Sequence, residues 1–189
     1  WRKQWHLGDI PFVYVQLPNF MKRSEYPMES NWALIREAQT QTLLVPNTAM
    51  SVTIDLGQAD DIHPKNKKDV GYRLALAAQC VAYKKNDIVC SGPEFSNLNR
   101  YKSQFIVYFK NNGSAGLKVH GDTLKGFEIA GSDRKYHKAE AVINKGLVIV
   151  SNKNVMVPQT IRYGWADNPD CNLFNIEGLP ACPFRIEDW

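Results

Sequence analysis

FVYVQL, at residues 12–17, opens the stretch of sequence that decides the fold. It is a short and nearly continuous apolar run, which is typical of a buried strand. Residues 32–39 (WALIREAQ) contain neither glycine nor proline and follow the capping candidates Ser30 and Asn31, so they predict a helix. Residues 50–56 (MSVTIDL) are rich in β-branched side chains and predict a second strand.

A long amphipathic helix is predicted over residues 64–83, because its apolar residues recur at helical spacing. These residues are Val70, Leu74, Ala77, Ala78 and Val81. The order strand, helix, strand, helix indicates an α/β fold with a parallel sheet.

Helical periodicity ends at residues 91–93 (SGP), and β-type patterns follow. Short apolar runs lie at residues 104–109, 127–130, 139–143, 147–150 and 155–157. The groups 111–113 (NNG) and 144–146 (NKG) are typical of hairpin turns. We therefore expect an α/β portion over residues 1–92 and a β-rich domain over residues 93–189, built as a small antiparallel sandwich.

The composition limits the class of protein. The chain of 189 residues is 44% hydrophobic and 22% charged, with a formal net charge of +4. It contains no low-complexity tract and no apolar run of transmembrane length, which excludes disordered, fibrous and membrane-spanning classes. A charge this small, without clustering, gives no indication of nucleic-acid binding.

Four cysteines are present: Cys80, Cys90, Cys171 and Cys182. None of them forms a CxxC pair, so zinc and thioredoxin-like sites have little support. Free buried thiols are one hypothesis, and a Cys171–Cys182 bridge in an oxidising compartment is the other.

The candidate for chemistry is the loop that follows the second predicted strand. It delivers His63 directly before the predicted helix, and Pro64 suits the first position of that helix. In α/β sheets, ligands bind beyond the carboxyl ends of the strands, where this loop lies. An imidazole held beside the carboxylates Asp60 and Asp61 is suited to act as a general base. Without further support, however, the two aspartates could equally stabilise the helix N-terminus, and the histidine could be solvated.

Several separate stretches, in order, resemble the sialate O-acetylesterase family of SGNH (GDSL-like) hydrolases. They are residues 11–17, 32–39, 53–57, 61–67, 71–75, 91–93, 126–131, 161–165 and 175–185. The resemblance is to the carboxyl-terminal part of that family. It implies the last portion of a flavodoxin-like SGNH sheet followed by a β-sandwich domain.

The resemblance implies that His63 is the base of a catalytic triad. General SGNH enzymes place the acid three residues earlier, at Asp60, whereas the sialate family is more constant at the position of Asp61. We favour Asp60 from this comparison, with Asp61 turned away or capping the helix; a backbone carbonyl is a third possibility. The family's serine nucleophile lies in a Gly-Gln-Ser-Asn-Met type motif, and this chain contains no Gly-Gln-Ser sequence. The expected partner is therefore a missing N-terminal segment that carries the serine and the oxyanion donors, and the chain alone is expected to be inactive.

The implied reaction is removal of O-acetyl groups from sialic acid or a related acetylated sugar, without metal or organic cofactor. Arg36 and Arg73 are candidates for binding the sialic acid carboxylate. An acetyl-xylan-type esterase is an alternative. A second alternative is a non-catalytic carbohydrate-binding module in which Tyr163 and Trp165 stack on sugars, although such aromatic residues more often belong to a core. The family's substrates and the even cysteine count predict an extracytoplasmic location, lysosomal or secreted in a eukaryote and periplasmic or exported in a bacterium.

Overall fold

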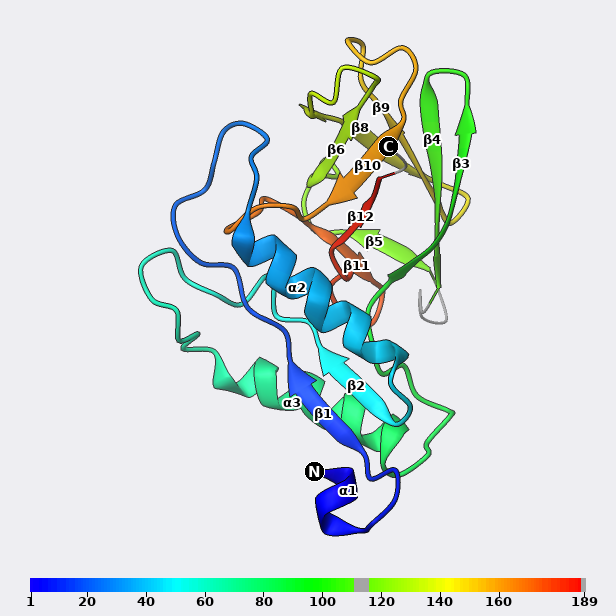
Figure 1. Ribbon diagram of the computed structural model, residues 1–189. Helices are drawn as coiled ribbons and strands as arrows, with labels where there is room; N and C mark the ends of the chain where they lie inside the picture. Colours follow the sequence, from blue (N-terminus) through cyan, green and yellow to red (C-terminus); the bar gives the residue numbers. More distant parts are fainter. Residues whose placement is uncertain (111–115, 188–189) are drawn as a thin grey trace.

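The computed structural model of the protein describes residues 1–110 and 116–187. Figure 1 shows the helices gathered in one part of the molecule and most of the strands in the other. The predicted turn at residues 111–113 lies outside the described residues.

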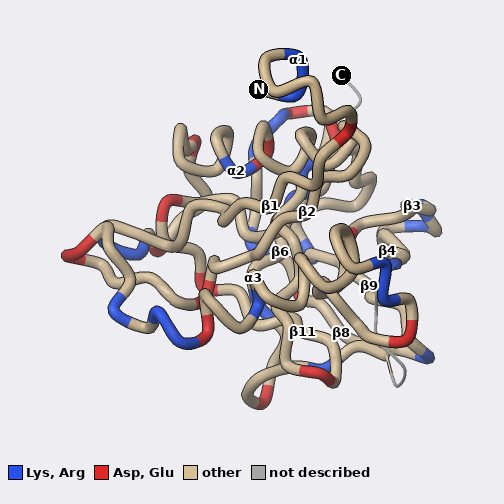
Figure 2. Tube along the Cα trace, turned by 90° about the horizontal axis from the view of Figure 1, so that it is seen from below, with Lys and Arg blue, Asp and Glu red and all other residues tan. Residues whose placement is uncertain are grey.

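The helical part is organised around two parallel strands, β1 (Phe12–Val15) and β2 (Thr48–Ser51). Helices α2 (Asn31–Gln41) and α3 (Lys67–Val81) lie on opposite faces of this pair (Figures 1 and 2). A short helix α1 (Arg2–Trp5) precedes β1, and the short 3-10 helix η1 (Thr42–Leu44) follows α2. The predicted order strand, helix, strand, helix and the parallel pairing are confirmed.

Two predicted boundaries are wrong. Strand β2 ends at Ser51 instead of continuing to Leu56, because the chain turns after it, with a hydrogen bond from Leu56 N to Thr53 O. Helix α3 begins at Lys67 instead of Pro64, because Asn66 is its N-cap. The Asn66 side chain accepts a hydrogen bond of 3.1 Å from the Asp69 amide, which satisfies one of the free N–H groups of the first turn.

Helix α2 starts where its capping sequence predicts. Ser30 is the N-cap, and its hydroxyl oxygen accepts a hydrogen bond of 2.9 Å from the Ala33 amide. The same hydroxyl donates to Asp167 Oδ1 at 2.6 Å. The cap therefore also connects the helix to the β-rich part of the chain.

Among its described residues, the β-rich part contains three antiparallel sheets. The first has the order β3–β4–β9–β8, formed by Glu94–Tyr101, Gln104–Lys110, Leu147–Ser151 and Glu140–Asn144. The second has the order β12–β10–β6–β7, formed by Phe184–Ile186, Thr160–Tyr163, Phe127–Ala130 and His137–Lys138. The third is the pair β11–β5, formed by Leu173–Asn175 and Leu117–Val119.

Side chains of the two four-stranded sheets meet in one hydrophobic core. Its completely buried members are Val107, Ile129, Val148, Val150, Ile161, Leu173 and Ala181. The predicted antiparallel character is confirmed, and so is the hairpin turn between β8 and β9, where Lys145 and Gly146 have φ angles of 50° and 78°. The run at residues 155–157 forms no strand.

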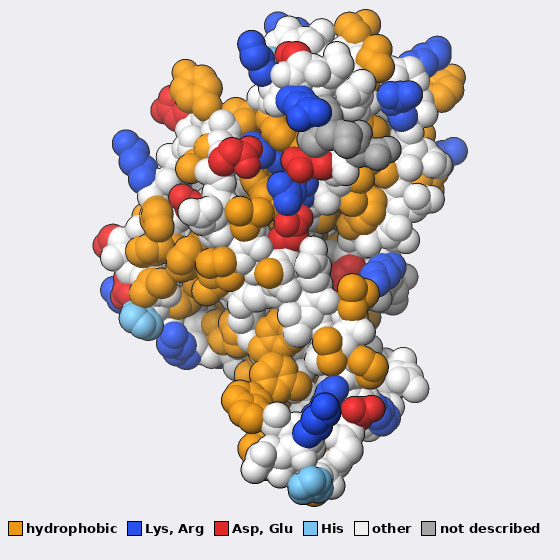
Figure 3. Space-filling view, viewed as in Figure 1, with side chains coloured by type: hydrophobic (Ala, Val, Ile, Leu, Met, Phe, Trp, Pro, Cys, Tyr) orange, Lys and Arg blue, Asp and Glu red, His pale blue; other side chains and the backbone are white. Residues whose placement is uncertain are grey.

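The two parts of the chain are joined by many polar contacts. Arg185 of β12 pairs with Glu37 of α2 at 2.9 Å and with Glu187 at 3.2 Å. Figure 3 shows acidic and basic side chains close together on this face of the molecule, and Figure 2 shows both signs interspersed along the trace. Gly92 packs so tightly that a Cβ atom there would lie 2.0 Å from the carbonyl oxygen of Pro180.

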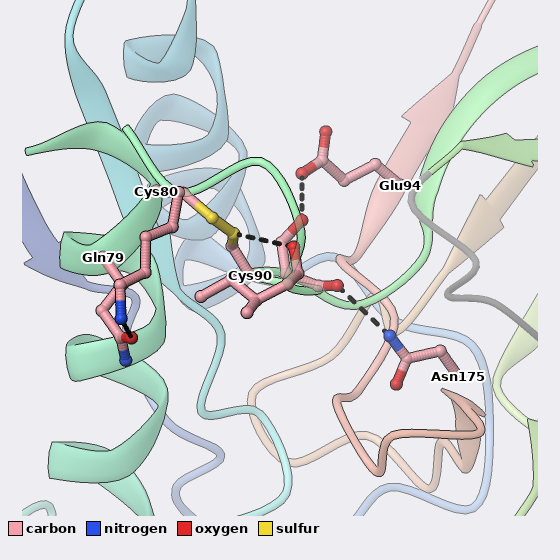
Figure 4. Close-up of a disulfide and its surroundings, with 8 residues drawn as sticks. Gln79, Cys80, Cys90, Glu94 and Asn175 are labelled. Carbon is pink, nitrogen blue, oxygen red and sulfur yellow. Dashed lines mark hydrogen bonds between the residues drawn. A yellow bond between two sulfur atoms is a disulfide. The ribbon is translucent and has the colours of Figure 1, made fainter. Parts of the chain in front are cut away.

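Cys80 and Cys90 form a disulfide, and Cys171 and Cys182 are free. Figure 4 shows that the bond ties the end of α3 to the segment that leads into β3. The hypothesis of a Cys171–Cys182 bridge is therefore wrong. Burial raises the pKa of both free thiols to about 12, which makes them unreactive near neutral pH.

Candidate active site

The loop that carries His63 is held firmly where it leaves β2. Asp55 accepts two hydrogen bonds from Arg73 of α3, at 2.6 and 2.7 Å, and Arg73 also donates to the carbonyl of Val52 at 2.9 Å. Such a bidentate pair fixes the relative orientation of loop and helix. The strand end and the helix are thereby locked together.

A second contact fixes the loop two residues later. The amide of Gly57 donates a hydrogen bond of 2.6 Å to Asn19 Oδ1, and Asn19 lies in the segment after β1. A Cβ atom on Gly57 would lie 1.8 Å from the carbonyl oxygen of Asn19, so this approach requires glycine. The ends of the two parallel strands are connected through this contact.

His63 lies on the surface beside Asp61. The backbone amide of His63 donates to Asp61 Oδ1 at 2.8 Å, and the imidazole Nδ1 lies 3.5 Å from the same oxygen. The imidazole is 85% exposed. The hydrogen bond from the His63 amide is the main cause that lowers the pKa of Asp61. Asp61 is therefore ionised at neutral pH and close enough to orient the ring.

Asp60 is exposed and makes no hydrogen bond or ion pair with any described residue. The geometry thus favours Asp61 as the partner of His63, the reverse of the preference drawn from sequence. Because Asp61 lies on the Nδ1 side of the ring, Nε2 is the nitrogen left for a nucleophile.

The two arginines considered for a substrate carboxylate are both engaged in the protein itself. Arg36 is completely buried, and it donates to the carbonyl oxygens of Leu17, Pro18, Ala166 and Asp167. Arg73 is committed to Asp55 and Val52, as described above. The expectation that these residues bind a ligand carboxylate is therefore wrong.

Two serine hydroxyls of the chain form hydrogen bonds elsewhere in the structure. Ser30 caps α2, and the hydroxyl of Ser91 donates to Glu94 at 3.2 Å. Within residues 1–110 and 116–187, no hydrogen bond joins His63 to a serine hydroxyl. The described part of the chain therefore presents a candidate base and a carboxylate, with no serine hydroxyl hydrogen-bonded to the histidine.

Two further observations concern other classes of site. Among the described residues, no cluster of three or more His, Cys, Asp and Glu side chains is placed to bind a metal ion. In the same part of the chain, no helix combines the length and apolar character needed to cross a membrane.

Sequence reasoning missed the residues that hold the loop. Gly57 directly follows the predicted strand at residues 50–56, and this position gives no sign of its contact with Asn19. Arg73 is a candidate for a ligand carboxylate from sequence, whereas in the structure it pairs with Asp55. Nothing in the local sequence points from Asn19 to Gly57, because the two residues are 38 positions apart. One sequence feature could have pointed to the internal role of Arg73. It lies on the otherwise apolar face of the predicted helix, where a charged side chain needs a partner within the protein.

A mixed α/β fold with several antiparallel sheets, and a histidine–carboxylate pair on a loop after a parallel strand, are typical of the hydrolase class. No family model matches the chain. The chain is similar over its whole length to the crystal structure of a carbohydrate acetylesterase from Xanthomonas citri, with a TM-score of 0.93 and 43% identity.

The chain is also similar to curated proteins named sialate O-acetylesterase. It is 29% identical to the Mus musculus protein over 209 residues and 28% identical to the Homo sapiens protein over 214 residues, and both matches include 97% of the chain. The resemblance to the sialate O-acetylesterase family is confirmed by these matches. The chain spans 38 to 40% of the length of these two relatives and 44% of the Xanthomonas chain.

Proposed function

We propose that this chain carries the base of a serine-type carbohydrate O-acetylesterase. The observation that carries the proposal is the His63–Asp61 pair, on a loop after a parallel strand, in a chain 43% identical to a carbohydrate acetylesterase. The substrate class is an O-acetylated sialic acid or a related acetylated glycan. An acetyl-xylan-type substrate is the alternative, because the name of the Xanthomonas relative specifies only a carbohydrate.

In this proposal the imidazole acts twice. Nε2 of His63 takes the proton of a serine hydroxyl, the serine oxygen attacks the acetyl carbonyl, and the protonated ring then gives its proton to the departing sugar oxygen. In the second half the ring deprotonates water, which attacks the acetyl-enzyme and releases acetate. Asp61 holds Nδ1 and stabilises the positive charge on the ring; Asp60 would do so only if the loop moved.

The serine and the oxyanion donors are proposed to come from a polypeptide segment outside these 189 residues, in agreement with the absence of Gly-Gln-Ser. Two features support such a partner. Each strand of the parallel pair has a single neighbour among the described residues, and Trp1, Trp5 and Phe12 are exposed beside β1. An open strand edge and exposed aromatic side chains favour pairing with further chain.

The finer description of the fold belongs to the same proposal. Residues 1–92 would be the last portion of a flavodoxin-like SGNH domain, and residues 93–189 a β-sandwich domain. The change from helices to antiparallel strands between Val81 and Glu94 supports this division. We further propose an extracytoplasmic location, which the Cys80–Cys90 disulfide supports because such bonds persist in oxidising compartments.

The test is esterase turnover of the full-length protein with His63→Asn, using His6→Asn as the matched control. His6 is exposed and lies at the end of α1. Loss of turnover with His63→Asn alone, with an unchanged circular dichroism spectrum, is the expected result. Full activity of His63→Asn would refute the assignment. Asp61→Asn should reduce turnover more than Asp60→Asn.

The 189-residue chain by itself should not hydrolyse acetyl esters at an enzymatic rate. Oxyanion donors alone typically contribute roughly 10²–10³ in rate, and the proposal places them on the other segment. The measurement is hydrolysis of an aryl acetate and of O-acetylated sialic acid, first by the chain and then by the chain with the complementary segment. Saturable turnover by the chain alone that disappears with His63→Asn would contradict the proposed division of the site.

A further inference from the structure

The proposed reaction gives no role to the β-rich part of the chain. Sugar stacking by two of its aromatic residues is the role considered from sequence, and the structure contradicts it. Tyr163 is a core residue, 1% exposed, and its hydroxyl accepts from the Leu173 amide at 3.0 Å. Trp165 is 3% exposed, and the guanidinium of Arg185 lies 4.3 Å from the centre of its ring. The expectation that these two rings stack on a sugar is therefore wrong.

Trp165 is instead buried directly before a segment, residues 166–168, that contacts the helical part of the chain. The carbonyl oxygen of Asp167 accepts a hydrogen bond of 3.1 Å from the Phe20 amide, and its carboxylate accepts one of 2.6 Å from the Ser30 hydroxyl. Figure 1 shows the chain after β10 beside the N-terminal end of α2. The β-rich part is thus bonded directly to the loop that follows β1.

Asn168, the last residue of this segment, is paired with Asn19. Asn19 Nδ2 donates to Asn168 Oδ1 at 2.9 Å, and Asn168 Nδ2 donates to the carbonyl of Met21 at 2.7 Å. Asn19 is 9% exposed and Asn168 is 6% exposed, so water does not compete for these bonds. Because both ends of the Asn168 amide are used, its oxygen is fixed as the acceptor, and this fixes which way the Asn19 amide faces.

The other end of the Asn19 side chain holds the loop that carries His63. Asn19 Oδ1 accepts from the Gly57 amide at 2.6 Å. From residue 58 to residue 64, the loop makes no hydrogen bond with a described residue outside this stretch; its one hydrogen bond is internal, from the His63 amide to Asp61. The contact between Asn19 and Gly57 is therefore the last hydrogen bond that ties the loop to the rest of the described chain before His63.

We propose that Asn168 and Asn19 are positioning residues for His63, acting through the amide of Gly57, so that the β-rich part sets the place of the base. This inference rests on the proposed function, in which His63 must meet a serine on another segment. A misplacement of about 1 Å, caused far from the reacting groups, can cost roughly 10²-fold in rate. The two hydrogen bonds are short, and the approach at Gly57 leaves no room for a Cβ atom. A change at Asn168 therefore shifts the start of the loop.

The experiment measures kcat and KM of the full-length protein for an aryl acetate. Asn168→Ala removes the acceptor for Asn19, and it should lower kcat by about 10- to 100-fold while KM changes by less than about twofold, because the substrate itself is not touched. The matched control is Asn172→Ala. The Asn172 side chain makes three hydrogen bonds, all to backbone groups within residues 120–125 of the β-rich part. Its loss should change kcat by less than about twofold.

Further variants separate positioning from a general loss of packing. Asn168→Asp keeps an oxygen that accepts from Asn19 Nδ2 and loses only the donor to Met21, so kcat should recover to within about threefold of the wild-type value. Asn19→Ala should lower kcat as Asn168→Ala does. The double variant should be within about twofold of Asn19→Ala alone, because both residues act through one contact. Losses that multiply in the double variant would overturn the proposed connection.

Amide hydrogen exchange follows the loop without the reaction. In full-length Asn168→Ala, the peptide at residues 57–66 should exchange at least about threefold faster than in the wild-type protein and in Asn172→Ala. Unchanged exchange of this peptide would overturn the proposal. If Asn168→Ala does not fold, Asn19→Asp tests the same contact, because it keeps the acceptor for Gly57 and loses the donor to Asn168.

Two different results distinguish the failure of this role from the failure of the proposed function. Wild-type kcat in folded Asn168→Ala or Asn19→Asp, in a protein that His63→Asn inactivates, would overturn the positioning role alone. Full activity of His63→Asn would refute the proposed base, and the positioning role with it.

Discussion

Two loops follow the two parallel strands, and they are held in opposite ways. The segment after β1 is bound to the β-rich part by buried polar groups: Arg36 reaches the carbonyls of Ala166 and Asp167, and Asn19 donates to Asn168 Oδ1 at 2.9 Å. The segment after β2 is fixed at its start and its end, but it presents His63 to solvent. The same position relative to a sheet therefore carries a buried, rigidly held segment in one case and a solvent-exposed histidine in the other.

The contrast has a physical reason. Buried carbonyl groups need donors, and Arg36 satisfies four of them at once, which fixes the first loop. In the second loop the contact between Asp61 and His63 spans only two residues, so it orders the ring without anchoring it to the rest of the protein. The role proposed for His63, as the base for a serine on another segment, requires this exposure.

The largest effect is expected in the first loop. Arg36→Met should lower the free energy of unfolding by about 3–5 kcal/mol, because it leaves several buried carbonyls without donors. The control Arg23→Met removes an exposed pair with Asp170 and should change stability by less than about 1 kcal/mol. Urea unfolding followed by tryptophan fluorescence measures both. Equal effects of the two variants would show that the first loop is not held by Arg36.

The helix that follows the second loop, α3, is held at its C-terminal end by the Cys80–Cys90 disulfide. Replacing both Cys80 and Cys90 by alanine should lower stability by about 2–3 kcal/mol, since the bond closes a loop with a sequence separation of 10. Thiol titration of the denatured, unreduced wild-type protein should detect two free thiols, those of Cys171 and Cys182. Four free thiols would contradict the Cys80–Cys90 pairing.

The contact between the two loops, from Gly57 to Asn19, is tested by a glycine substitution, with a second glycine, Gly71, as the control. Gly57→Ala should destabilise by about 1–3 kcal/mol, because its Cβ would overlap the backbone of Asn19. Gly71→Ala lies in α3 with no atom within 4 Å of the added carbon, and it should stabilise by about 0.5–1 kcal/mol through better helix propensity. Thermal unfolding compares the two variants. The prediction fails if Gly57→Ala is neutral.

The smallest effect is expected at low pH, where the hydrogen bond between the His63 amide and Asp61 is lost. The pKa of Asp61 is lowered in the folded protein, so its contact with the His63 amide contributes above the ordinary aspartate pKa and is lost as the pH falls through the lowered value. The chemical shift of the His63 amide should therefore show an acid transition below the ordinary aspartate range. Asp61→Asn should abolish that transition. Its persistence in the variant would assign it to another carboxylate.

Much of the fold was predictable because it depends on local patterns. The strand at residues 12–15, the Ser30 cap and the hairpin at residues 144–146 follow from apolar runs, a capping hydroxyl and glycine chemistry within a few residues. The boundaries of β2 and α3 were misplaced because β-branched residues continue past Ser51 while the chain already turns, and because Asn66 caps more effectively than the position before Pro64. Local propensity alone could not decide where β2 ends and where α3 begins.

The candidate site divides in the same way. The sequence by itself determined that His63 and two aspartates lie together on one loop, because they are neighbours in the chain. Only the tertiary structure decided that Asp61 faces the ring, that Arg36 and Arg73 are internal supports, and that Asn19 meets Gly57. These contacts join residues from 18 to more than 100 positions apart, or depend on which way a side chain turns. Packing and the pairing of buried polar groups select such arrangements, and a one-dimensional pattern does not contain them.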